Sequence, residues 1–597
     1  MASISIDWHS SADREEAFFI VNNPQIAQIF NEIADMLELL NENPFRIRSY
    51  RKAAMILEAL PHEIRDLDES KWGDIPGIGK DLSAKIKEFN LTGKVRAYQE
   101  LHEKIPPELL DMVQIPGLGP KTVKKLWDEL GITTMAELEK AGHEHKIQKL
   151  KGLGEKIEEK ILKGIELKRK YKERHGLGKT IPLAQEILSS LQQKAPISKI
   201  DLAGSLRRMK ETAADIDILA SSKDSKKVMD VFVKLPIVQE VLAYGETKSS
   251  ILTKQGIQCD LRVVEEKSYG SAFHYFTGSK AHNIRIRQLA QEKGLKVNEY
   301  GVFREEEFLG GKTEQEVFEA VGLPYIPPEL REDRGEIEAG LAGSLPDLIE
   351  LSDIKGDCHI HTLWSDGSQS LEVMAEAARK RYQYAALSDH SRLVGITGGM
   401  DAETLLKQIK VIRNLAKQYS DFTLLCGIEV DIKSDGTLDM PDSALKELDL
   451  AVASVHVKFN MTEEEMTARI IKAMENPYVT IIGHPTGRLI GYREPYPVNM
   501  GKVLDAAKRT GTFMELNSFW DRLDLNDVHL RMAKGSSDLK GVKIVIDTDS
   551  HHTSHFEMLK YGVSTARRGW IEALDVVNTL PAEEFLKAIQ EKRARIA

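Results

Sequence analysis

Short apolar runs that each end in a residue able to bind a metal ion dominate the last part of the chain. AALSDH, LLCGIEV, AVASVH, TIIGH and KIVIDTDSH are typical of buried strands, and CHIHTLWSDG begins the series. A β/α barrel builds its active site where the C-terminal ends of its strands meet. Imidazoles mixed with carboxylates suit a cluster of Zn, Mn or Fe ions. The pattern predicts a metal-dependent hydrolase with nine ligands: His359, His361, Asp366, His390, Glu429, His456, His484, Asp549 and His551.

A single histidine at a strand end is more often a hydrogen-bonded core residue than a metal ligand. His529, His552 and His555 lie in the same segment and suit that role, or the support of the ligands. The convergence of many candidate ligands on separate strand ends favours the metal site for the nine.

The bulk composition indicates several globular domains. A chain of 597 residues is too long for one core, and 42% hydrophobic with 29% charged residues is typical of globular proteins. No apolar run is long enough to span a bilayer, and the N-terminus lacks the pattern of an export signal. Cys259, Cys358 and Cys426 are scattered singly, which suits a reducing compartment. We expect a cytoplasmic protein without a membrane partner.

The net charge of −10 is distributed unevenly. Residues 151–300 hold 28 Lys and Arg against 19 Asp and Glu, whereas residues 301–350 hold 4 against 13. The basic block is compatible with a path for a polyanion and equally with a solvated helical face. The change of sign falls at PYIPPELREDRGEIEAGLAGSLPD, which we predict to be an inter-domain linker.

The first 175 residues carry a repeated signature between predicted helices. IPGIGKDLSAKI at 75–86, IPGLGPKTVKKL at 115–126 and LKGLGEKIEEKI at 150–161 share a Gly-x-Gly turn. The turn precedes a helix whose free N–H groups and dipole suit a phosphate, and lysines follow. One copy is an ordinary turn, but three copies predict helix-hairpin-helix binding of DNA without sequence preference. The turn glycines expected to contact DNA are Gly77, Gly79, Gly117 and Gly119.

The middle of the chain carries candidate catalytic carboxylates. In ADIDIL, Asp215 and Asp217 alternate and share one face of a strand, and Asp260 arises in the alternating segment GIQCDLRVV. Three carboxylates can hold two Mg²⁺ ions, one at a 3′-hydroxyl and one at a triphosphate, for in-line displacement. Asp-x-Asp alone is commonplace at solvated strand ends. The Gly-Ser-x-x-Arg turn upstream, containing Ser205 and Arg208, makes the pattern specific.

AGSLRRMKETAADID, YFTGSKAHNIRIR and NEYGVF resemble motifs of DNA polymerase family X, and the resemblance covers about residues 24–325. It implies that Ser205 and Arg208 contact the triphosphate. In the second motif it implies a nucleotide pocket in which aromatic side chains back the sugar, a Gly-Ser pair approaches sugar and phosphates, and an asparagine reaches the nascent base. These residues are Tyr275, Phe276, Gly278, Ser279 and Asn283.

The same resemblance implies DNA contacts outside the pocket. Arg287 stands where the family contacts the template, and Phe45, Arg46 and Tyr50 stand where it holds template or 5′-phosphate. Lys85 falls where lyase-competent members keep a Schiff-base lysine.

The chain departs from the family at two neighbouring functions. A phosphate-binding lysine of the family is Asp81 here, and Thr180 replaces a triphosphate-binding arginine of eukaryotic members. We therefore expect reduced affinity for a 5′-phosphate. Lys85 is open to two interpretations, a lyase nucleophile or a plain phosphate contact.

From about residue 355 the chain resembles the PHP (polymerase and histidinol phosphatase) superfamily, and all nine ligand positions match. The resemblance implies about three ions, Mn²⁺ or Zn²⁺, that share a bridging carboxylate and a water or hydroxide. Mn²⁺ is favoured by the resemblance alone, since the ligand set also admits Zn and Fe. Arg488 directly follows one ligand segment and is a candidate contact for a substrate phosphate.

Together these observations predict a multidomain fold. It comprises an all-α helix-hairpin-helix head, an α+β nucleotidyltransferase-type palm with a thumb, and a C-terminal distorted β/α barrel of the PHP type. The predicted parts are an uninterpreted extension (1–23), a helical DNA-binding domain (24–100), a fingers-like helix-hairpin-helix domain (101–178), the palm (179–265), the thumb (266–325), a linker (326–354) and the PHP phosphoesterase domain (355–597).

The resemblances imply a gap-filling DNA repair polymerase that acts as a monomer on gapped or primed DNA and dNTPs. They imply that the barrel is a Mn²⁺-dependent 3′–5′ exonuclease that processes 3′ ends, with abasic-site cleavage as a further family activity. Two alternatives remain for the barrel: a small-molecule phosphatase, or a structural module without catalysis.

Overall fold

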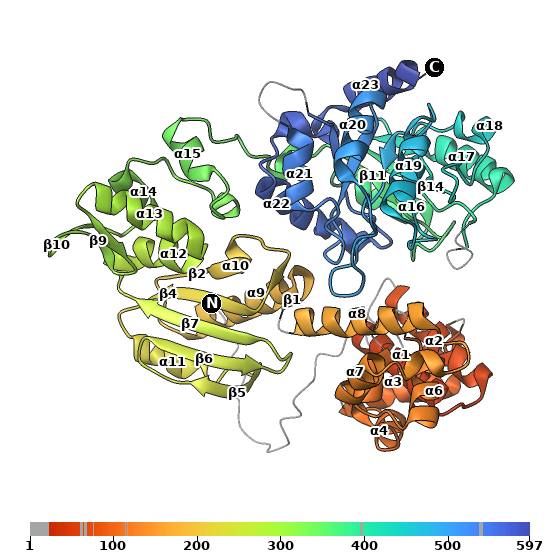
Figure 1. Ribbon diagram of the computed structural model, residues 1–597, viewed down its shortest axis with the longest axis horizontal. Helices are drawn as coiled ribbons and strands as arrows, with labels where there is room; N and C mark the ends of the chain where they lie inside the picture. Colours follow the sequence, from red (N-terminus) through yellow and green to blue (C-terminus); the bar gives the residue numbers. More distant parts are fainter. Residues whose placement is uncertain are drawn as a thin grey trace, which may run out of the picture. The chain divides into compact units, whose positions relative to one another are not determined.

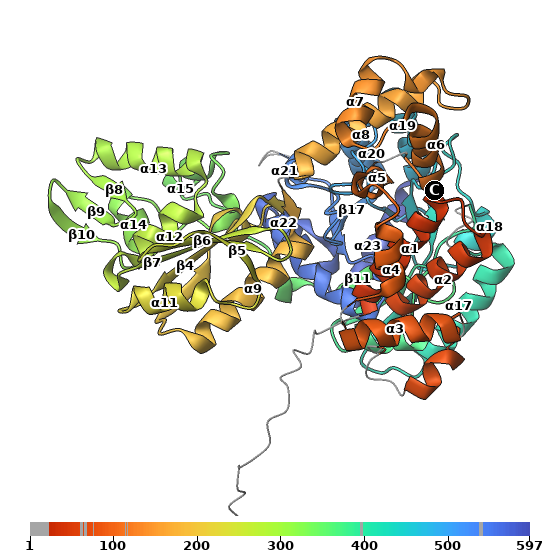
Figure 2. The ribbon, with the colours of Figure 1, turned by 90° about the horizontal axis from the view of Figure 1, so that it is seen from below.

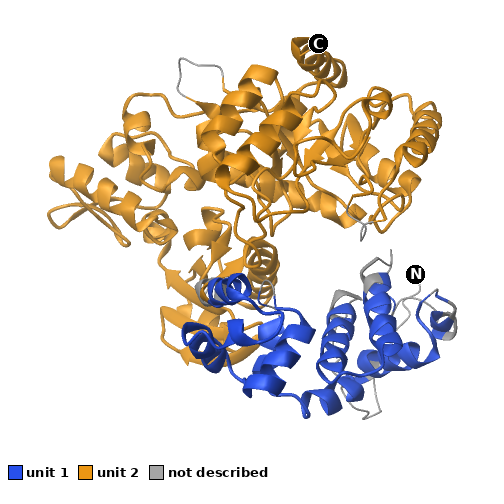
Figure 3. Cartoon of the chain, turned by 45° about the vertical axis from the view of Figure 1, so that its right-hand side comes forward, with its two compact units in different colours: residues 1–165 blue, residues 166–597 orange. Residues whose placement is uncertain are grey.

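The computed structural model forms two compact units, residues 1–165 and 166–597 (Figure 3). It describes residues 23–59, 64, 69–75, 77–92, 94–113, 115, 118–172, 174–393, 398–535 and 541–596. Residues 1–22 of the predicted extension, and Gly117, lie outside the described residues. Among the described helices, none combines the length and the apolar character needed to cross a bilayer.

The described residues of the first unit form helices joined by loops and no strand, which confirms the predicted all-α head (Figure 1). Gly79, Gly119 and Gly154 each directly precede a helix, so every copy of the repeated signature begins a second hairpin helix as predicted. The α-helices are α1 (Asn23–Leu39), α2 (Pro44–Ala59), α3 (Lys80–Thr92), α4 (Arg96–His102), α5 (Pro107–Val113), α6 (Pro120–Leu130), α7 (Met135–His143) and α8 (Glu155–Lys172).

The second unit begins with a five-stranded sheet in the order β2-β4-β7-β6-β5, in which only β4 and β7 run parallel. Figure 2 shows helices α9 and α11 on one face of this sheet and α12 on the other. Ile216 and Ile218 alternate with the aspartates of ADIDIL and are buried, because alternate residues of a strand face opposite sides. The bounds are α9 (Leu177–Lys194), β2 (Lys199–Leu202), α10 (Gly204–Arg207), β4 (Asp215–Ser221), α11 (Ser225–Phe232), β5 (Val238–Ala243), β6 (Lys248–Thr253) and β7 (Gln258–Val264), with a short pair β1 (His175–Gly176) and β3 (Thr212–Ala213).

A helical layer with a three-stranded antiparallel sheet follows, in the order β10-β9-β8. One buried carboxylate joins this layer to the preceding sheet: Glu314 lies 2.5 Å from Arg207 and 2.6 Å from Arg331. Burial opposes ionisation of Glu314, but the hydrogen bond and charge of the two arginines lower its pKa to about 2. The elements are α12 (Tyr269–Thr277), α13 (Lys280–Glu292), β8 (Lys296–Asn298), β9 (Gly301–Arg304), β10 (Glu307–Gly310), α14 (Glu314–Val321) and α15 (Glu336–Leu341).

Residues 356–596, here called the C-terminal segment, contain two sheets of parallel strands. Isolated parallel bridges join the sheets at two places, His390 to Glu429 and Ile360 to Ser550, so the strand pairing continues around the segment. Parallel strands place their C-terminal ends on one side. The strands are β11 (Gly356–Ile360), β12 (Tyr384–Leu387), β13 (Thr423–Cys426), β14 (Glu429–Asp431), β15 (Val452–Ser454), β16 (Ile481–Ile482), β17 (Phe513–Asn517) and β18 (Ile544–Asp547).

Helices alternate with most of these strands, as parallel pairing requires. Because helices cover the sheets, nearly every strand residue is buried, which explains the continuous apolar runs seen in the sequence. The helices are α16 (Leu371–Arg379), α17 (Ala402–Ala416), α18 (Asp442–Leu445), α19 (Glu463–Met474), α20 (Met500–Thr510), α21 (Asp527–Lys534), α22 (Leu559–Arg568) and α23 (Ala582–Ile596).

The five-stranded sheet and the C-terminal segment share a hydrophobic core within the second unit. Ile490, Leu523 and Tyr561 are buried in the same cluster as the sheet residues Ile216 and Ile218. The two parts are therefore packed as one body, and a polar contact between Arg488 and Glu211, at 2.8 Å, adds to the apolar one.

The contact is close enough to require glycine at the start of α9. A Cβ atom on Gly178 would lie 2.3 Å from Cγ of Trp520, well inside van der Waals contact. Forcing atoms into a packed site typically costs about 1–3 kcal/mol.

We therefore expect Gly178→Ala to lower the unfolding midpoint of the second unit by several degrees in a thermal melt followed by near-UV circular dichroism. Gly501→Ala, in helix α20, is the matched control. A Cβ atom on Gly501 would meet only Asn499 Oδ1, at 3.4 Å. Equal midpoints for the two variants would contradict the close contact.

Candidate active sites

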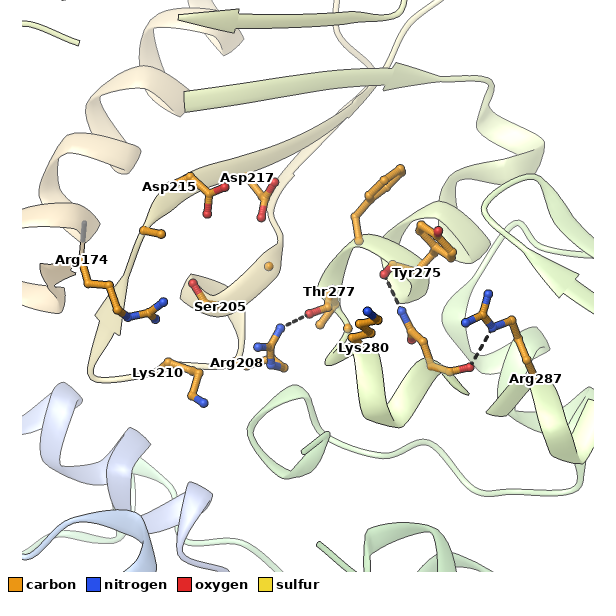
Figure 4. Close-up of a pocket in the computed structure, with 15 residues that line it drawn as sticks. Arg174, Ser205, Arg208, Lys210, Asp215, Asp217, Tyr275, Thr277, Lys280 and Arg287 are labelled. Carbon is orange, nitrogen blue, oxygen red and sulfur yellow. Dashed lines mark hydrogen bonds between the residues drawn. The ribbon is translucent and has the colours of Figure 1, made fainter. Parts of the chain in front are cut away.

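Three carboxylates gather at the parallel pair of strands β4 and β7. Asp217 stands directly opposite Asp260 in the ladder, and Asp215 shares the face of Asp217. Lys248 Nζ lies 3.0 Å from Asp260 Oδ2. The structure thus brings together the three aspartates predicted from the sequence, and Figure 4 shows Asp215 and Asp217 at the edge of a cavity.

The electrostatics of this trio favour a bound cation. Burial raises the pKa of Asp217 to about 7, and the charges of Asp215 and Asp260 add to the rise. Burial also raises the pKa of Asp215, with a contribution from Asp260. Burial opposes ionisation of Asp260 as well, but hydrogen bonds from Gln258 and Lys248 hold its pKa below the usual value. Divalent ions would relieve the repulsion, and carboxylate oxygens are the ligands that Mg²⁺ prefers.

Gly204 is a functional position that the sequence reasoning missed. Its φ is +58°, and a Cβ atom there would lie 2.1 Å from Asp217 Oδ2. Only glycine permits the turn before α10 to approach the carboxylate this closely. The signal was present in AGSLRR, where the glycine directly precedes Ser205.

A cavity of about 580 Å³ lies beside the carboxylates (Figure 4). It is lined by seven of the residues predicted to contact nucleotide or template: Ser205, Arg208, Tyr275, Phe276, Gly278, Asn283 and Arg287. Ser279 was predicted in the same group, but it is absent from the described lining. Its hydroxyl accepts a hydrogen bond from the backbone N–H of His282 and caps α13.

The cavity is basic opposite the aspartates. Arg174, Lys210 and Lys280 line it, and none of them was identified from the sequence. Arg174 is held in place by hydrogen bonds to the hydroxyl and carbonyl of Thr212, at 2.9 and 2.6 Å. Thr180, which replaces an arginine of eukaryotic family members, is buried and donates its hydroxyl to the carbonyl of Gly176. Arg174 supplies a positive charge to the cavity that Thr180 cannot.

Hydrogen bonds and ring contacts order the far wall of the cavity. Asn283 Nδ2 donates to the carbonyl of Tyr275 at 2.7 Å, and Arg287 Nε donates to the carbonyl of Asn283 at 3.3 Å (Figure 4). The rings of Tyr275 and Phe276 pack edge to face at 5.1 Å. An apolar aromatic wall beside basic groups suits a sugar and its phosphates.

The residues predicted to bind DNA in the first unit differ in exposure. The Phe45 side chain is 73% exposed and Arg46 is also exposed, so both can reach a ligand. The Tyr50 ring is buried against Phe30, which gives it a part in the core. Lys85 Nζ forms an ion pair with Asp81 at 2.6 Å. This contact is compatible with both interpretations of Lys85, a lyase nucleophile and a phosphate contact.

The second site lies at the C-terminal ends of the parallel strands. Eight of the nine predicted ligands form three overlapping groups whose ligand atoms lie within 4.8 Å of one another. His484 joins them through Glu429, with 3.0 Å between Nε2 and Oε1. The groups are His361, Asp366, His390 and His551; His359, His361 and Asp549; and His390, Glu429 and His456.

Unpaired ring nitrogens show that the site fits metal ions. Nε2 of His359 and both ring nitrogens of His361 are buried without a hydrogen-bond partner among the described residues. Such atoms are costly in a protein interior unless a ligand satisfies them. Glu429 lies within 3.3 Å of His359, 2.9 Å of His390 and 3.2 Å of His456, so it contacts more than one ligand group.

Buried acidic and amide groups orient the ligands from behind, as metal sites require. Glu515 Oε1 lies 2.5 Å from His359 Nδ1, and Asp431 Oδ1 lies 2.9 Å from His456 Nδ1. Burial favours the neutral ring of His359, but the charges of Glu515, Asp549 and Glu429 raise its pKa well above the usual value. The sequence reasoning missed Glu515 and Asp431, although both stand in strand runs, FMELN and IEVDI.

Other candidates in this region have structural roles. His552 caps a short helix by accepting from the backbone N–H of Ser554, and His555 Nδ1 accepts from the N–H of His551. Arg488 was a candidate phosphate contact, but its guanidinium donates to the carbonyls of Arg522 and Leu523 and to Glu211. Arg488 therefore contributes to the contact between the C-terminal segment and the part that contains the five-stranded sheet.

Arg522 is a basic group beside the cluster that the sequence reasoning missed. Its Nε lies 3.4 Å from Asp549 Oδ2, and its Nη1 is buried without a hydrogen-bond partner among the described residues.

Family models match three stretches of the chain. A helix-hairpin-helix domain matches residues 21–95, a SAM-like helix-hairpin-helix tandem matches 109–167, and a DNA polymerase beta thumb matches 272–332. The two hairpin models cover all three copies of the Gly-x-Gly signature.

Whole-length comparison gives relatives of two kinds. A protein of Thermoanaerobacter sp. (strain X514) named as a probable phosphatase is 30% identical over 249 residues, 40% of this chain and 96% of its own. DNA polymerase lambda of Arabidopsis thaliana is 27% identical over 345 residues, 52% of this chain and 62% of its own. DNA polymerase/3′-5′ exonuclease PolX of Bacillus subtilis (strain 168) is 39% identical over 575 residues, 95% of this chain and all of its own. This chain therefore belongs to the family of bacterial PolX proteins, which is a branch of DNA polymerase family X.

Proposed function

We propose that the chain is a DNA-directed DNA polymerase that fills gaps, with a 3′–5′ exonuclease in its C-terminal segment. The observation that carries the polymerase is the trio Asp215, Asp217 and Asp260 at the edge of a basic cavity. Mg²⁺ ions bound there would activate a primer 3′-hydroxyl and neutralise the leaving pyrophosphate. The carboxylates hold the ions, and Arg208 and Arg174 bind the triphosphate of an incoming dNTP.

The positions of the two sites along the chain suggest how it divides into domains. We assign residues 24–100 and 101–178 to DNA binding, 179–265 to the palm, 266–325 to the thumb, 326–354 to a linker, and 355–597 to a distorted PHP barrel. Tyr275 and Phe276 back the sugar, Gly278 lies along the sugar and phosphates, and Asn283 faces the nascent base. Template and primer contacts are assigned to Arg287, Phe45, Arg46 and the hairpin turns.

For the C-terminal segment we propose a metal-dependent phosphodiesterase that removes nucleotides from DNA 3′ ends. About three ions, one for each ligand group, would activate water and stabilise the negative charge on the phosphoryl oxygens. Mn²⁺ and Zn²⁺ both fit the mixed ligand set. Glu429 bridges the groups, Glu515 and Asp431 fix the rings of His359 and His456, and Arg522 binds the scissile phosphate.

A second candidate function for this segment is hydrolysis of a small phosphomonoester. The relative named as a probable phosphatase supports it, since 96% of that protein aligns with this chain. The neighbouring DNA-binding parts favour a DNA end over a small molecule.

We place the protein in the cytoplasm as a monomer acting on gapped or primed DNA. Its three cysteines are buried and free, as suits a reducing compartment.

Asp217→Ala should lower gap filling on the order of a thousandfold, because a bound ion would lose the carboxylate that stands between Asp215 and Asp260. The measurement is single-nucleotide incorporation into a gapped duplex, with 3′–5′ degradation measured on the same preparation. Degradation should persist at the wild-type rate. Retained incorporation would reject the carboxylate trio as the polymerisation site.

Glu429→Ala should have the reciprocal effect, because Glu429 contacts His359, His390, His456 and His484. Degradation of 3′-labelled DNA should fall on the order of a thousandfold and incorporation should be spared. His552→Ala is the matched control, since His552 belongs to none of the ligand groups.

The substrate is tested on the full-length Asp217→Ala variant, in which synthesis does not obscure degradation. We expect faster turnover of 3′-labelled DNA than of p-nitrophenyl phosphate or histidinol phosphate. A preference for either small phosphomonoester would establish the second candidate instead.

Elemental analysis of the purified protein should find about three Mn or Zn ions per chain. His361→Ala should lose more metal than His484→Ala, because His361 belongs to two ligand groups and His484 to none. Equal retention by both variants would contradict the ligand grouping.

A further inference from the structure

Arg568, at the end of α22 in the C-terminal segment, reaches the polymerisation pocket. Its side chain is 4% exposed, so its contacts are made away from bulk water. Nη1 donates to the backbone carbonyl of Arg208 at 2.8 Å and to Glu332 Oε1 at 3.1 Å. Nη2 donates to Asp527 Oδ2 at 2.8 Å. One guanidinium therefore joins three acceptors, and one of them is the backbone of a residue that lines the cavity.

Glu332 connects Arg568 to the cations of the pocket. Its carboxylate lies 3.0 Å from Arg208 Nε and 3.8 Å from Lys210 Nζ, and both side chains line the cavity. The Arg208 side chain also donates to the carbonyl of Thr277 (Figure 4). The direction of the Arg208 guanidinium is thus set by Glu332 on one side and by Thr277 on the other.

The backbone at this point is strained, which makes the carbonyl contact important. Met209, directly after Arg208, has a φ of +52°, and a non-glycine residue in that region costs about 1–2 kcal/mol. The hydrogen bond from Arg568 to the Arg208 carbonyl stabilises the turn just before this residue. Without it, the turn would lose one of its hydrogen bonds, and Glu332 would keep only its contacts with Arg208 and Lys210.

We propose that Arg568 is a positioning residue for dNTP binding, through which the exonuclease half completes the nucleotide pocket of the polymerase half. The inference rests on the proposed polymerase function. A planar guanidinium is suited to this task because it presents several donors in fixed directions, whereas a lysine presents a single point charge. The C-terminal segment thus supports synthesis in addition to its own chemistry.

The test is steady-state incorporation of a single dNTP into gapped DNA by full-length variants. Arg568→Ala should raise KM for the dNTP about tenfold with little change in kcat, since binding of the triphosphate is affected and the carboxylates are not. Arg568→Lys should recover only part of the loss. Degradation of 3′-labelled DNA should stay at the wild-type rate, which also reports that the variant is folded.

Arg567→Ala is the matched control. Arg567 is the preceding residue, and its Nε forms an ion pair with Glu329 at 2.7 Å. Like Arg568, it therefore contacts a residue that lies before the C-terminal segment in the chain. Neither Arg208 nor Glu332 is among its contacts in the described residues. An equal rise of KM in Arg567→Ala would show a general loosening of the two parts and would overturn the proposal.

Glu332→Gln supplies an independent measurement if Arg568→Ala does not fold. It should also raise KM for the dNTP. Where Arg568→Ala does fold, the double variant should show less than the product of the two single effects, because both act on Arg208. A wild-type KM in Glu332→Gln, or in a folded Arg568→Ala, would overturn the inference. Absence of incorporation by the wild-type protein would instead reject the proposed polymerase function, so the two failures are distinct.

Discussion

Ionisable side chains brought together in the protein interior are the constraint on which both sites depend. In the five-stranded sheet, the parallel pairing of β4 with β7 sets Asp217 opposite Asp260. In the C-terminal segment, Glu429 and Asp549 lie among buried imidazoles. Folding alone leaves such groups poorly satisfied, and a divalent cation resolves the conflict. In both arrangements the backbone geometry places the candidate metal ligands beside one another.

The sequence was sufficient for the groups that stand at strand ends or alternate along a strand. Alternation in ADIDIL placed Asp215 and Asp217 on one face, and the apolar runs before His390 and His456 marked strands that end at a common side. These predictions succeed because the period of a strand and the direction of parallel pairing are local rules. The repeated Gly-x-Gly turn was equally readable, since each copy directly precedes a helix.

The sequence was insufficient where a role depends on a distant partner. Arg488 follows a ligand segment and looked like a phosphate contact, yet the fold presents it with two carbonyls and Glu211. Glu515 stands in an apolar run as Glu429 does, and only the position of His359 distinguishes its supporting role. Ser279 matches a pocket motif, but its hydroxyl caps α13. In each case the residue type was informative and the partner was set by tertiary packing.

The shared core of the second unit gives a physical reason for two activities in one chain. Ile490, Leu523 and Tyr561 bury apolar surface against the five-stranded sheet, so separating the parts would expose that surface to water. Within this fixed contact, a charged side chain of one part can be held within hydrogen-bonding distance of the other part's ligand pocket. Arg568 and the Arg208 carbonyl meet this condition. A flexible tether between two independent enzymes would not, because a buried hydrogen bond needs its donor and acceptor in one geometry. The joint core therefore does more than link the two halves, since it makes the nucleotide pocket of one depend on the packing of the other.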